Sequence, residues 1–270
     1  MKLGDLAVNR LGFGAMRVLG SEDVWGPPKD PANAKKVLRR AYELGANFFD
    51  TAESYGPQTD ELVIAEAMHP YPKDLVIGTK CGLVRPKPSR WDEDGRPEKL
   101  RSDLEGSLKR LKLDCLHLWQ LHAPDPKVPF EDSVGVLAEA QRQGKVRHVG
   151  LSNVSVRQLE QARKIVPIAS VQNRYNIGDR ASEAVLKACE TAGIIFLPWY
   201  PLGDGAALRN AKIKSLAKKL NATPAQVALA WLLAKSPVML PIPGTSSVEH
   251  LEENMGATKV RLSDEDMAAL

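Results

Sequence analysis

Four polar residues stand at or just after the ends of predicted strands, where their side chains could take part in proton transfer. Asp50 and Tyr55 belong to the end of one predicted strand, Lys80 ends the next, and His122 ends the one after that. A lysine ammonium close to a phenol stabilises the phenolate and lowers the tyrosine pKa from its reference value of about 10. The set therefore indicates acid–base chemistry, with Tyr55 as the proton donor and Lys80 as its charged neighbour.

Strand alternation predicts a partner for the lysine. Lys80 lies on the same strand face as Gly78, so its ammonium is directed into an apolar interior. An unpaired buried charge is very costly, and Asp50 on the neighbouring strand is the expected counter-ion. His122 shares its strand face with Gln120 and could donate a hydrogen bond to a substrate oxygen.

Each of these residues also has a simpler interpretation. Asp50 could cap a loop, Tyr55 could be a loop aromatic, and His122 could belong to a metal site with Cys115 and His117. The last two share a strand face that His122 does not, so a common ion is not expected. With five histidines and no HxH pair, a metal-dependent hydrolase is also disfavoured, and we expect no metal.

The elements that would position these residues alternate along the whole chain. A short β-branched apolar run is followed each time by a segment of helical period. The predicted strands are Arg10–Gly14, Asn47–Thr51, Leu75–Lys80, Cys115–His122, Val146–Asn153, Ile168–Asn173, Ile194–Tyr200 and Val238–Pro243. The predicted helices include Pro31–Leu44, Glu61–Met68, Pro97–Leu111, Phe130–Gln143, Val156–Val166, Ala181–Ala192 and Pro224–Lys235.

Eight such units favour an α/β fold in which parallel strands close into a (β/α)8 TIM barrel, rather than an open doubly wound sheet. The residues Leu3–Asn9, with a turn at Gly4 and Asp5, predict a short N-terminal β-hairpin ahead of the barrel. No linker or change of composition divides the chain, so residues 1–270 are expected to form a single domain. In a TIM barrel the chemistry lies at the carboxyl ends of the strands.

Composition excludes several classes of protein. Of the 270 residues, 43% are apolar and 26% are charged, with a net charge of +4, which suits a globular protein and gives poor evidence for nucleic-acid binding. The three cysteines have no CxxC spacing, which favours a reducing compartment. Residues 1–10 lack a secretory apolar segment, and no apolar run is long enough for a membrane span. We expect a cytoplasmic protein with no membrane association and no obligate protein partner.

Several ordered motifs together carry a resemblance to a known family. They are GFGAM at 12–16, NFFDTAESYG at 47–56, GKVRHVGLSN at 144–153, VQNRYN at 171–176, TPAQVALAWLL at 223–233 and IPGTSSVEHLEEN at 242–254. With Asp50, Tyr55, Lys80 and His122 in this order, the chain resembles the aldo-keto reductases over nearly its whole length. GPPKD and the 242–254 motif are most similar to the bacterial subgroup around pyridoxal reductase activity.

The resemblance implies an oxidoreductase that reduces an aldehyde or ketone to the alcohol, with hydride from NADPH and a proton from Tyr55. His122 would orient the carbonyl oxygen. A nicotinamide-binding regulatory module of the same fold is the alternative, and the absence of an additional N-terminal segment favours the enzyme. Family members usually continue past the position of Leu270, often with a tail that reaches the substrate pocket.

A cofactor site would have to be formed by the barrel itself, because the usual glycine-rich loops that bind nucleotides are absent. Gly12 and Gly14 begin a G-x-G, but Arg17 occupies the third glycine position, and no GxxxxGK[ST] occurs. The predicted helix Ser246–Ala257 follows a Gly-Thr pair, and such a helix N-terminus suits phosphate. By resemblance, the adenosine phosphate end of the cofactor would contact Gly244, Thr245, Ser246, His250, Glu253 and Asn254.

The remaining cofactor contacts are also implied by the resemblance. The nicotinamide amide would bind to Ser152, Asn153 and Gln172, the ring would stack on Tyr200, and the pyrophosphate would follow Pro201, Leu202 and Gly203. Many family members carry arginine where this chain has His250, and that arginine binds the 2′-phosphate of the cofactor. A histidine is a weaker cation for this phosphate, so we expect NADP(H) to bind better than NAD(H) by a smaller margin. Asn153 could instead only cap a helix, and Tyr200 could be a core aromatic.

Two tryptophans are candidates for the walls of the substrate pocket. Trp25 lies in the loop after the first predicted strand, and Trp91 lies in the long segment Gly82–Arg96. Long βα loops are usually functional, which favours contact with a small-molecule carbonyl substrate. Both could equally be solvent-exposed loop aromatics, and the basic residues of the long segment could form no more than a solvated loop.

Overall fold

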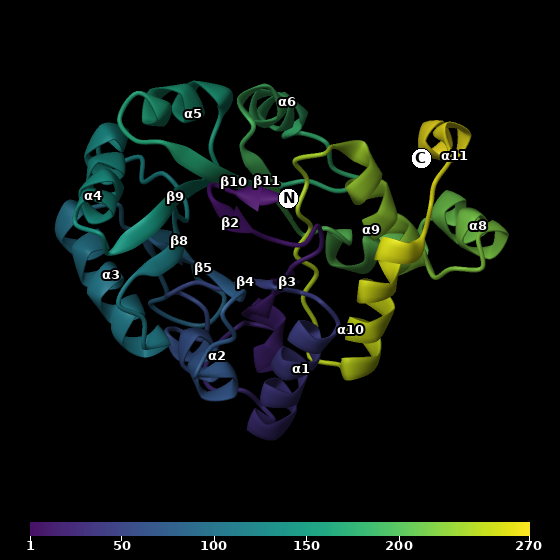
Figure 1. Ribbon diagram of the computed structural model, residues 1–270, viewed down its shortest axis with the longest axis horizontal. Coiled ribbons are helices and arrows are strands. Elements are labelled where there is room, and N and C mark those ends of the chain that lie inside the picture. Colours follow the sequence, from purple (N-terminus) through teal and green to yellow (C-terminus); the bar gives the residue numbers. More distant parts are fainter.

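The computed structural model describes residues 1–203 and 205–270, and within them parallel strands curl into a ring that is surrounded by helices (Figure 1). The barrel strands lie in the order β11-β10-β9-β8-β5-β4-β3, so neighbours in the ring are successive barrel strands along the chain, as expected for repeated βα units. The fold class predicted from the sequence, an α/β barrel of TIM type with a small N-terminal hairpin, is confirmed.

The strands are short and nearly all agree with the predicted runs. The barrel strands are β3 (Phe13–Gly14), β4 (Phe48–Asp50), β5 (Val76–Cys81), β8 (Leu116–Leu121), β9 (Val146–Ser152), β10 (Ile168–Arg174) and β11 (Ile195–Trp199). Two further pairs are the N-terminal hairpin, β1 (Lys2–Leu3) with β2 (Leu6–Ala7), and the hairpin β6 (Leu83–Val84) with β7 (Asp92–Glu93).

The helices that cover the ring also agree with the predicted segments to within a few residues. They are α1 (Pro31–Glu43), α2 (Thr59–Met68), α3 (Pro97–Leu111), α4 (Phe130–Arg142), α5 (Val156–Arg163), α6 (Glu183–Ala192), α9 (Pro224–Lys235) and α10 (Val248–Met255). The smaller ones are α7 (Ala206–Arg209), α8 (Ala211–Lys219) and α11 (Asp264–Ala269), with short 3-10 turns at Ala15–Leu19, Gly203–Gly205 and Gly256–Lys259.

The eighth predicted strand, Val238–Pro243, closes the ring without forming a regular ladder. Phe196 of β11 exchanges two main-chain hydrogen bonds with this segment, and Gly12 and Gly14, at the start of the ring, donate to two of its carbonyls. Two of its six residues are prolines, which have no N–H to donate, so only an isolated bridge forms.

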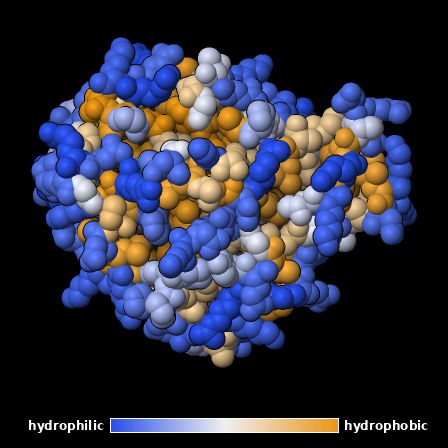
Figure 2. Space-filling view, in the orientation of Figure 1, coloured by the Kyte–Doolittle hydropathy of each residue, from blue (hydrophilic) through white to orange (hydrophobic). Residues whose placement is uncertain are grey.

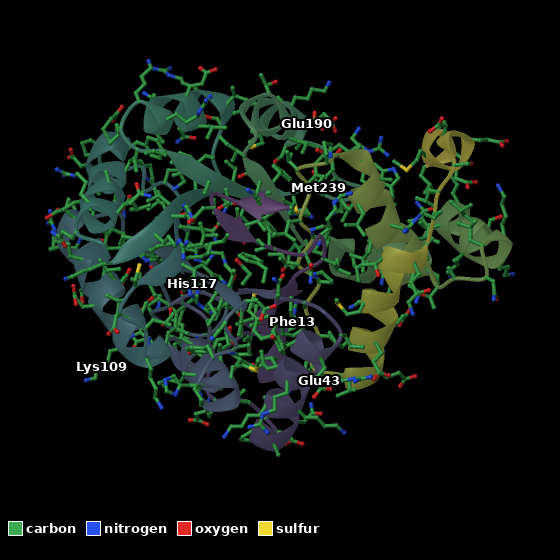
Figure 3. The ribbon with its side chains drawn as sticks, viewed as in Figure 1. Phe13, Glu43, Lys109, His117, Glu190 and Met239 are labelled. Carbon is green, nitrogen blue, oxygen red and sulfur yellow. The ribbon has the colours of Figure 1, made fainter. Side chains whose placement is uncertain are left out.

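Side chains fill the interior of the ring and the space between strands and helices. Phe13 and Met239 are fully buried, whereas Glu43, Lys109 and Glu190 lie at the periphery (Figure 3). Inside the ring a small apolar cluster includes Leu3 from the hairpin, so β1 and β2 seal the end where the strands begin. The opposite, carboxyl end of the strands remains open to the site described below.

One glycine in the strands makes space for a polar layer inside the ring. A Cβ on Gly150 would lie 2.3 Å from the hydroxyl of Ser170 and 2.8 Å from the side chain of Gln120. Because real Cβ atoms do not approach other atoms so closely, only glycine allows these two side chains to hydrogen bond to each other at 3.2 Å. This layer lies directly beneath Asp50, to which Gln120 donates at 3.4 Å.

A small lobe projects beside the barrel and was not predicted from the sequence. Helices α8 and α11 pack there around an apolar cluster that includes Ile213 and Leu216, and Figure 2 shows orange residues on this lobe among blue ones. On the rest of the face seen in Figure 2, hydrophilic residues predominate around the rim and apolar residues show toward the middle. Within the described residues, none of the helices has both the length and the apolar character that a membrane crossing requires.

Candidate active site

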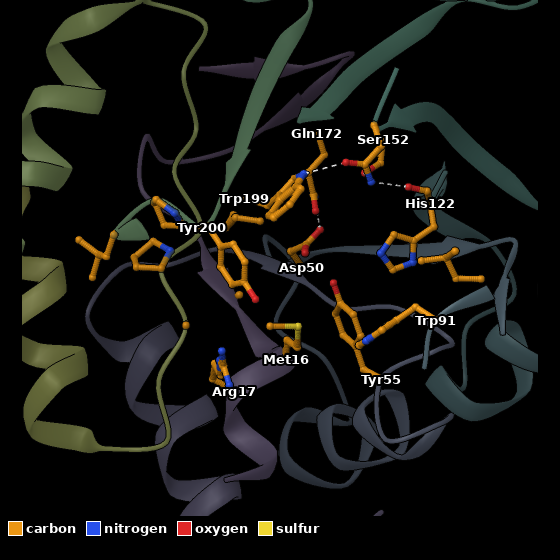
Figure 4. A pocket seen from close by; sticks show the side chains of 18 of the residues that line it. Met16, Arg17, Asp50, Tyr55, Trp91, His122, Ser152, Gln172, Trp199 and Tyr200 are labelled. Carbon is orange, nitrogen blue, oxygen red and sulfur yellow. Dashed lines mark hydrogen bonds between the residues drawn. The ribbon is translucent and has the colours of Figure 1, made fainter. Parts of the chain in front are cut away.

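A cavity of about 390 Å³ opens at the carboxyl ends of the strands, where a TIM barrel carries its chemistry. This volume is within the usual range for small-molecule sites. Its walls come from most of the barrel strands and their following loops (Figure 4). The lining residues are Gly14, Met16, Arg17, Asp50, Tyr55, Leu83, Trp91, His122, Ser152, Asn153, Gln172, Trp199, Tyr200, Pro201, Leu202, Gly205, Ile242, Pro243 and Gly244.

Lys80 is fully buried at the end of β5, and three oxygen atoms surround its ammonium group. Its Nζ donates to Asp50 Oδ2 at 2.7 Å, to the Thr51 carbonyl at 2.8 Å and to Tyr55 Oη at 3.2 Å. The strand register explains the contact, because Asp50 of β4 pairs with Gly78 of β5, two residues before the lysine. The structure thus brings together the three groups that the sequence predicted to pair.

The ammonium also lies 4.9 Å from the centre of the Tyr55 ring. Burial favours the neutral amine, but Asp50 and Tyr55 outweigh that effect, so the pKa of Lys80 is raised and the group stays charged. A charged ammonium therefore touches the phenol that lines the cavity.

The direction of the Tyr55 pKa corrects the expectation from the sequence. Burial of the phenol raises its pKa above the ordinary value of 10, and Lys80 counteracts this effect without reversing it. The sequence reasoning considered only the attraction of the cation and omitted the cost of removing a phenolate from water. Tyr55 is consequently a protonated phenol at neutral pH, which is the form that donates a proton.

His122 stands beside the phenol as a neutral ring. Its centre lies 5.7 Å from that of Tyr55, and its Nδ1 is 3.4 Å from the hydroxyl of Ser54. Burial, with a further contribution from Lys80, holds the pKa of His122 well below its ordinary value of 6.5. A neutral imidazole can donate one hydrogen bond to an oxygen atom in the cavity. Within the described residues no group of His, Cys, Asp and Glu could hold a metal ion.

Amide and hydroxyl side chains form the next part of the wall. Gln172 donates to Asp50 Oδ1 at 2.8 Å, and Asn153 donates to the carbonyl of His122 at 2.9 Å and to Ser152 Oγ at 3.1 Å. Asn153 has a left-handed backbone, with φ of 58°. The three residues that the sequence assigned to the nicotinamide amide therefore lie together, although several of their polar atoms already have protein partners.

Two aromatic rings from the end of β11 face this polar group. Tyr200 lines the cavity as expected, and Trp199, which the sequence reasoning missed, lies beside it at 5.0 Å between ring centres. Trp199 donates from Nε1 to Asn153 Oδ1 at 3.0 Å (Figure 4), so its ring stands against the amides. Trp199 precedes Tyr200 at a predicted strand end, and this position could have indicated that its ring lies at the cavity.

The predicted phosphate end is only partly brought to the cavity. Pro201, Leu202 and Gly244 line it, whereas six other predicted residues are absent from its lining: Gly203, Thr245, Ser246, His250, Glu253 and Asn254. Ser247 caps α10 by accepting from the main chain of His250 at 3.3 Å, and Thr245 accepts from Ser247 at 3.0 Å. The helix begins at Val248, two residues later than expected, because these hydroxyls cap it.

Met16 and Arg17 complete this end of the cavity and were not predicted to line it. Both follow β3 directly, in the GFGAM motif and the residue after it. Their position after a strand end was the signal, but the sequence reasoning used Arg17 only to reject a glycine-rich loop.

The two tryptophans predicted to wall the substrate pocket have different surroundings. Trp91 lines the cavity, with its ring centre 6.1 Å from that of Tyr55 and 6.5 Å from that of His122. Trp25 is not among the lining residues, and the guanidinium of Arg85 lies 5.5 Å from its ring centre. The cavity lining therefore supports the prediction for Trp91, whereas the prediction that Trp25 forms a wall has no such support.

The segment Gly82–Arg96 does not form only a solvated loop, the alternative considered for its basic residues. Arg85 is buried, and the segment that contains it folds into the β6–β7 hairpin.

A buried acid next to the site gives a prediction about stability. Asp60 accepts from Thr51 Oγ1 at 2.6 Å, while its Oδ1 has no partner, and burial raises its pKa to about 7. Because this acid has a higher pKa in the folded state than in the unfolded state, the folded protein loses stability as the pH rises from about 4 to about 7. We expect Asp60→Asn to stabilise the protein at pH 8 by about 2–4 kcal/mol and hardly at all at pH 4.

Urea unfolding of both proteins at pH 4, 6 and 8 measures this difference. A gain that stays constant with pH would contradict the assignment of Asp60 as a buried neutral acid.

Comparison with known proteins gives a match over almost the whole chain. The family model described as Aldo/keto reductase family matches residues 10–270. An uncharacterized oxidoreductase of Schizosaccharomyces pombe is 48% identical over 271 residues, which cover 100% of this chain and 88% of that protein. Pyridoxine 4-dehydrogenase of Escherichia coli is 46% identical over 275 residues, covering 99% and 96%.

A solved structure shares the arrangement of strands and helices. It is an aldo-keto reductase from Klebsiella pneumoniae in complex with NADPH, with a TM-score of 0.81 and 24% sequence identity. The match covers 97% of this chain and 89% of that one. At this identity the likeness supports the fold, and it agrees with the ring of parallel strands described above.

Proposed function

The chain belongs to the aldo/keto reductase family, and we propose that it is an NADPH-dependent oxidoreductase that reduces an aldehyde or ketone to the alcohol. Its relatives are an oxidoreductase and a pyridoxine dehydrogenase, which supports redox chemistry on a small carbonyl or alcohol. The observation that carries the proposal is the contact of Lys80 with Asp50 and Tyr55 at the edge of the cavity. We further propose that residues 1–270 act as one domain.

The residues that line the cavity fit a nicotinamide dinucleotide. The side chains of Ser152, Asn153 and Gln172 offer hydrogen bonds for a carboxamide, and flat rings stand beside them at Trp199 and Tyr200. Toward the other end lie Arg17, whose charge suits phosphate, and the segment around Pro201 and Leu202. The bound cofactor would supply the hydride. The exposed His250 would be a weaker partner than arginine for a second phosphate.

The protein's own groups then handle the proton. Tyr55, kept protonated by burial, would donate its phenolic proton to the substrate oxygen as negative charge develops there. Lys80 would stabilise the phenolate left behind, and Asp50 would hold the lysine in place. The neutral His122 would donate a hydrogen bond that fixes the position of the carbonyl oxygen.

Coenzyme titration tests the cofactor proposal directly. We expect NADPH to quench tryptophan fluorescence, because Trp91 and Trp199 line the cavity, and to bind about tenfold more tightly than NADH. Equal or tighter binding of NADH would contradict the preference for NADPH. Absence of binding by both would contradict the cofactor site.

Turnover separates an enzyme from a cofactor-binding regulatory module of the same fold. We expect oxidation of NADPH with at least some members of a panel that contains pyridoxal, benzaldehyde and short aliphatic aldehydes. Tight binding of NADPH with no oxidation across the panel would favour the regulatory module.

The free thiols at Cys81, Cys115 and Cys189 agree with a cytoplasmic location, which we also propose.

A further inference from the structure

Arg85 is an almost fully buried cation, 7% exposed, and it links two loops that border the cavity. Its guanidinium donates to the carbonyls of Asp23 at 2.7 Å and Val24 at 3.1 Å in the loop after β3. It also donates from Nε to the carbonyl of Arg90 at 3.0 Å in the β6–β7 hairpin. A planar guanidinium with fixed donor directions can hold two segments in one relative position, which a lysine ammonium does less well.

The same guanidinium supports the indole of Trp91 from outside the cavity. It lies 3.7 Å from the centre of the Trp91 ring, within the range for a cation–π contact, and 5.5 Å from that of Trp25. Trp91 is 37% exposed and would have several positions open to it without this contact. Because Arg85 occupies one face of the indole, the other face and the edge remain for the cavity, beside Tyr55 and His122.

The charge of Arg85 has no direct carboxylate partner within the described residues. The nearest acid, Asp23, accepts a hydrogen bond from Ser89 through its carboxylate and contacts Arg85 through its main-chain carbonyl. Inside the barrel, by contrast, Lys80 is balanced by Asp50. Arg85 is instead held by main-chain carbonyls, with the Asp23 carboxylate close enough to act on its charge. The indole that Arg85 supports offers the cavity a flat surface on which a planar aromatic ring can stack or pack edge-on.

We propose that Arg85 is a positioning residue that holds Trp91 over the Tyr55–His122 pair, and that this wall selects planar aromatic aldehydes over aliphatic ones. The inference rests on the proposed function, because it assumes that Tyr55 and His122 face the carbonyl group. It adds the class of substrate and a residue outside the cavity lining that determines it.

Steady-state kinetics with matched aldehydes tests the proposal. The probes are benzaldehyde and propanal, each with saturating NADPH. For the wild type we expect kcat/KM for benzaldehyde to exceed that for propanal about tenfold or more. In Arg85→Met we expect KM for benzaldehyde to rise about tenfold, with kcat and the constants for propanal changed less than about twofold.

Three variants separate positioning from charge and from general loss of structure. Arg90→Met removes an exposed neighbouring charge but keeps the carbonyl that Arg85 uses, and it should leave the kinetic constants for both aldehydes unchanged. Trp91→Ala should reproduce the effect of Arg85→Met, and the double variant should add little to either single one. Arg85→Lys keeps the charge without the three-carbonyl geometry and should resemble Arg85→Met for benzaldehyde.

Several results would overturn the proposal. These are equal losses for propanal and benzaldehyde, additive effects of the two single variants, full recovery in Arg85→Lys, and an unchanged KM in Trp91→Ala. If the wild type oxidises NADPH with none of the aldehydes, the proposed function itself fails. If it reduces propanal as efficiently as benzaldehyde, the proposed function stands and only the inference about Arg85 and Trp91 fails.

Discussion

Replacement of Tyr55 by phenylalanine is expected to lower kcat for aldehyde reduction by about 10²–10⁴-fold, the usual contribution of a positioned general acid. The phenol lies at the edge of the cavity, 7% exposed, with Lys80 3.2 Å from its oxygen. Without the hydroxyl, the substrate oxygen gains negative charge with no proton donor beside it. Stopped-flow measurement of NADPH oxidation with a reactive aromatic aldehyde gives the rate of this step.

The binding of NADPH should be nearly unaffected in Tyr55→Phe, because the ring remains and only an oxygen is lost. A change of less than about twofold in the dissociation constant is expected, measured by the same fluorescence titration. Tyr71→Phe is the matched control, since Tyr71 donates to the carbonyl of Leu111 at 2.7 Å, away from the cavity lining. Unchanged turnover in Tyr55→Phe, or an equal loss in Tyr71→Phe, would contradict the assignment.

The acidity of Tyr55 also determines how the rate depends on pH. Reduction needs the protonated phenol, so activity is present below the pKa of Tyr55 and lost as the pH rises through it. Because burial raises that pKa above 10, the rate of reduction should not fall through neutral pH on account of this group. Oxidation of the alcohol needs the phenolate and should increase with pH over the same range.

The central part of the site could be predicted from the sequence because it depends on local rules. Alternation of side chains along a strand places Asp50, Lys80 and Gln172 on inward faces, and parallel strands bring their ends to one edge. The cost of an unpaired buried ammonium then requires a partner within reach. These arguments need no knowledge of how loops cross the barrel.

The parts that the sequence did not predict depend on contacts between distant segments. Trp25 and Trp91 both follow strands, but only the structure shows Arg85 over Trp25 and the hairpin that brings Trp91 to Tyr55. The net pKa of Tyr55 depends on the depth of its burial, which spacing does not reveal. The closing segment 238–243 was predicted as a strand, but its prolines prevent a regular ladder.

Lys80→Met is expected to produce the second large loss, about 10²–10³-fold in kcat, together with a changed pH profile. Methionine has a similar length but offers no charge to the Tyr55 oxygen. The pKa of the phenol should therefore rise further, because burial then acts without the opposing cation. The alkaline limb of the rate profile for reduction should move out of the measurable range, and an unaltered limb would contradict the pairing.

The same substitution leaves Asp50 buried without its cation, so a loss of stability could be mistaken for a loss of catalysis. Removal of one partner of a buried pair costs about 3–5 kcal/mol, although Gln172 and Gln120 still donate to the carboxylate here. The double variant Asp50→Asn with Lys80→Met removes the unpaired charge. It should recover much of the stability in urea unfolding and none of the activity. Recovery of activity along with stability would show that Lys80 acts only by holding the fold together and not on the phenol.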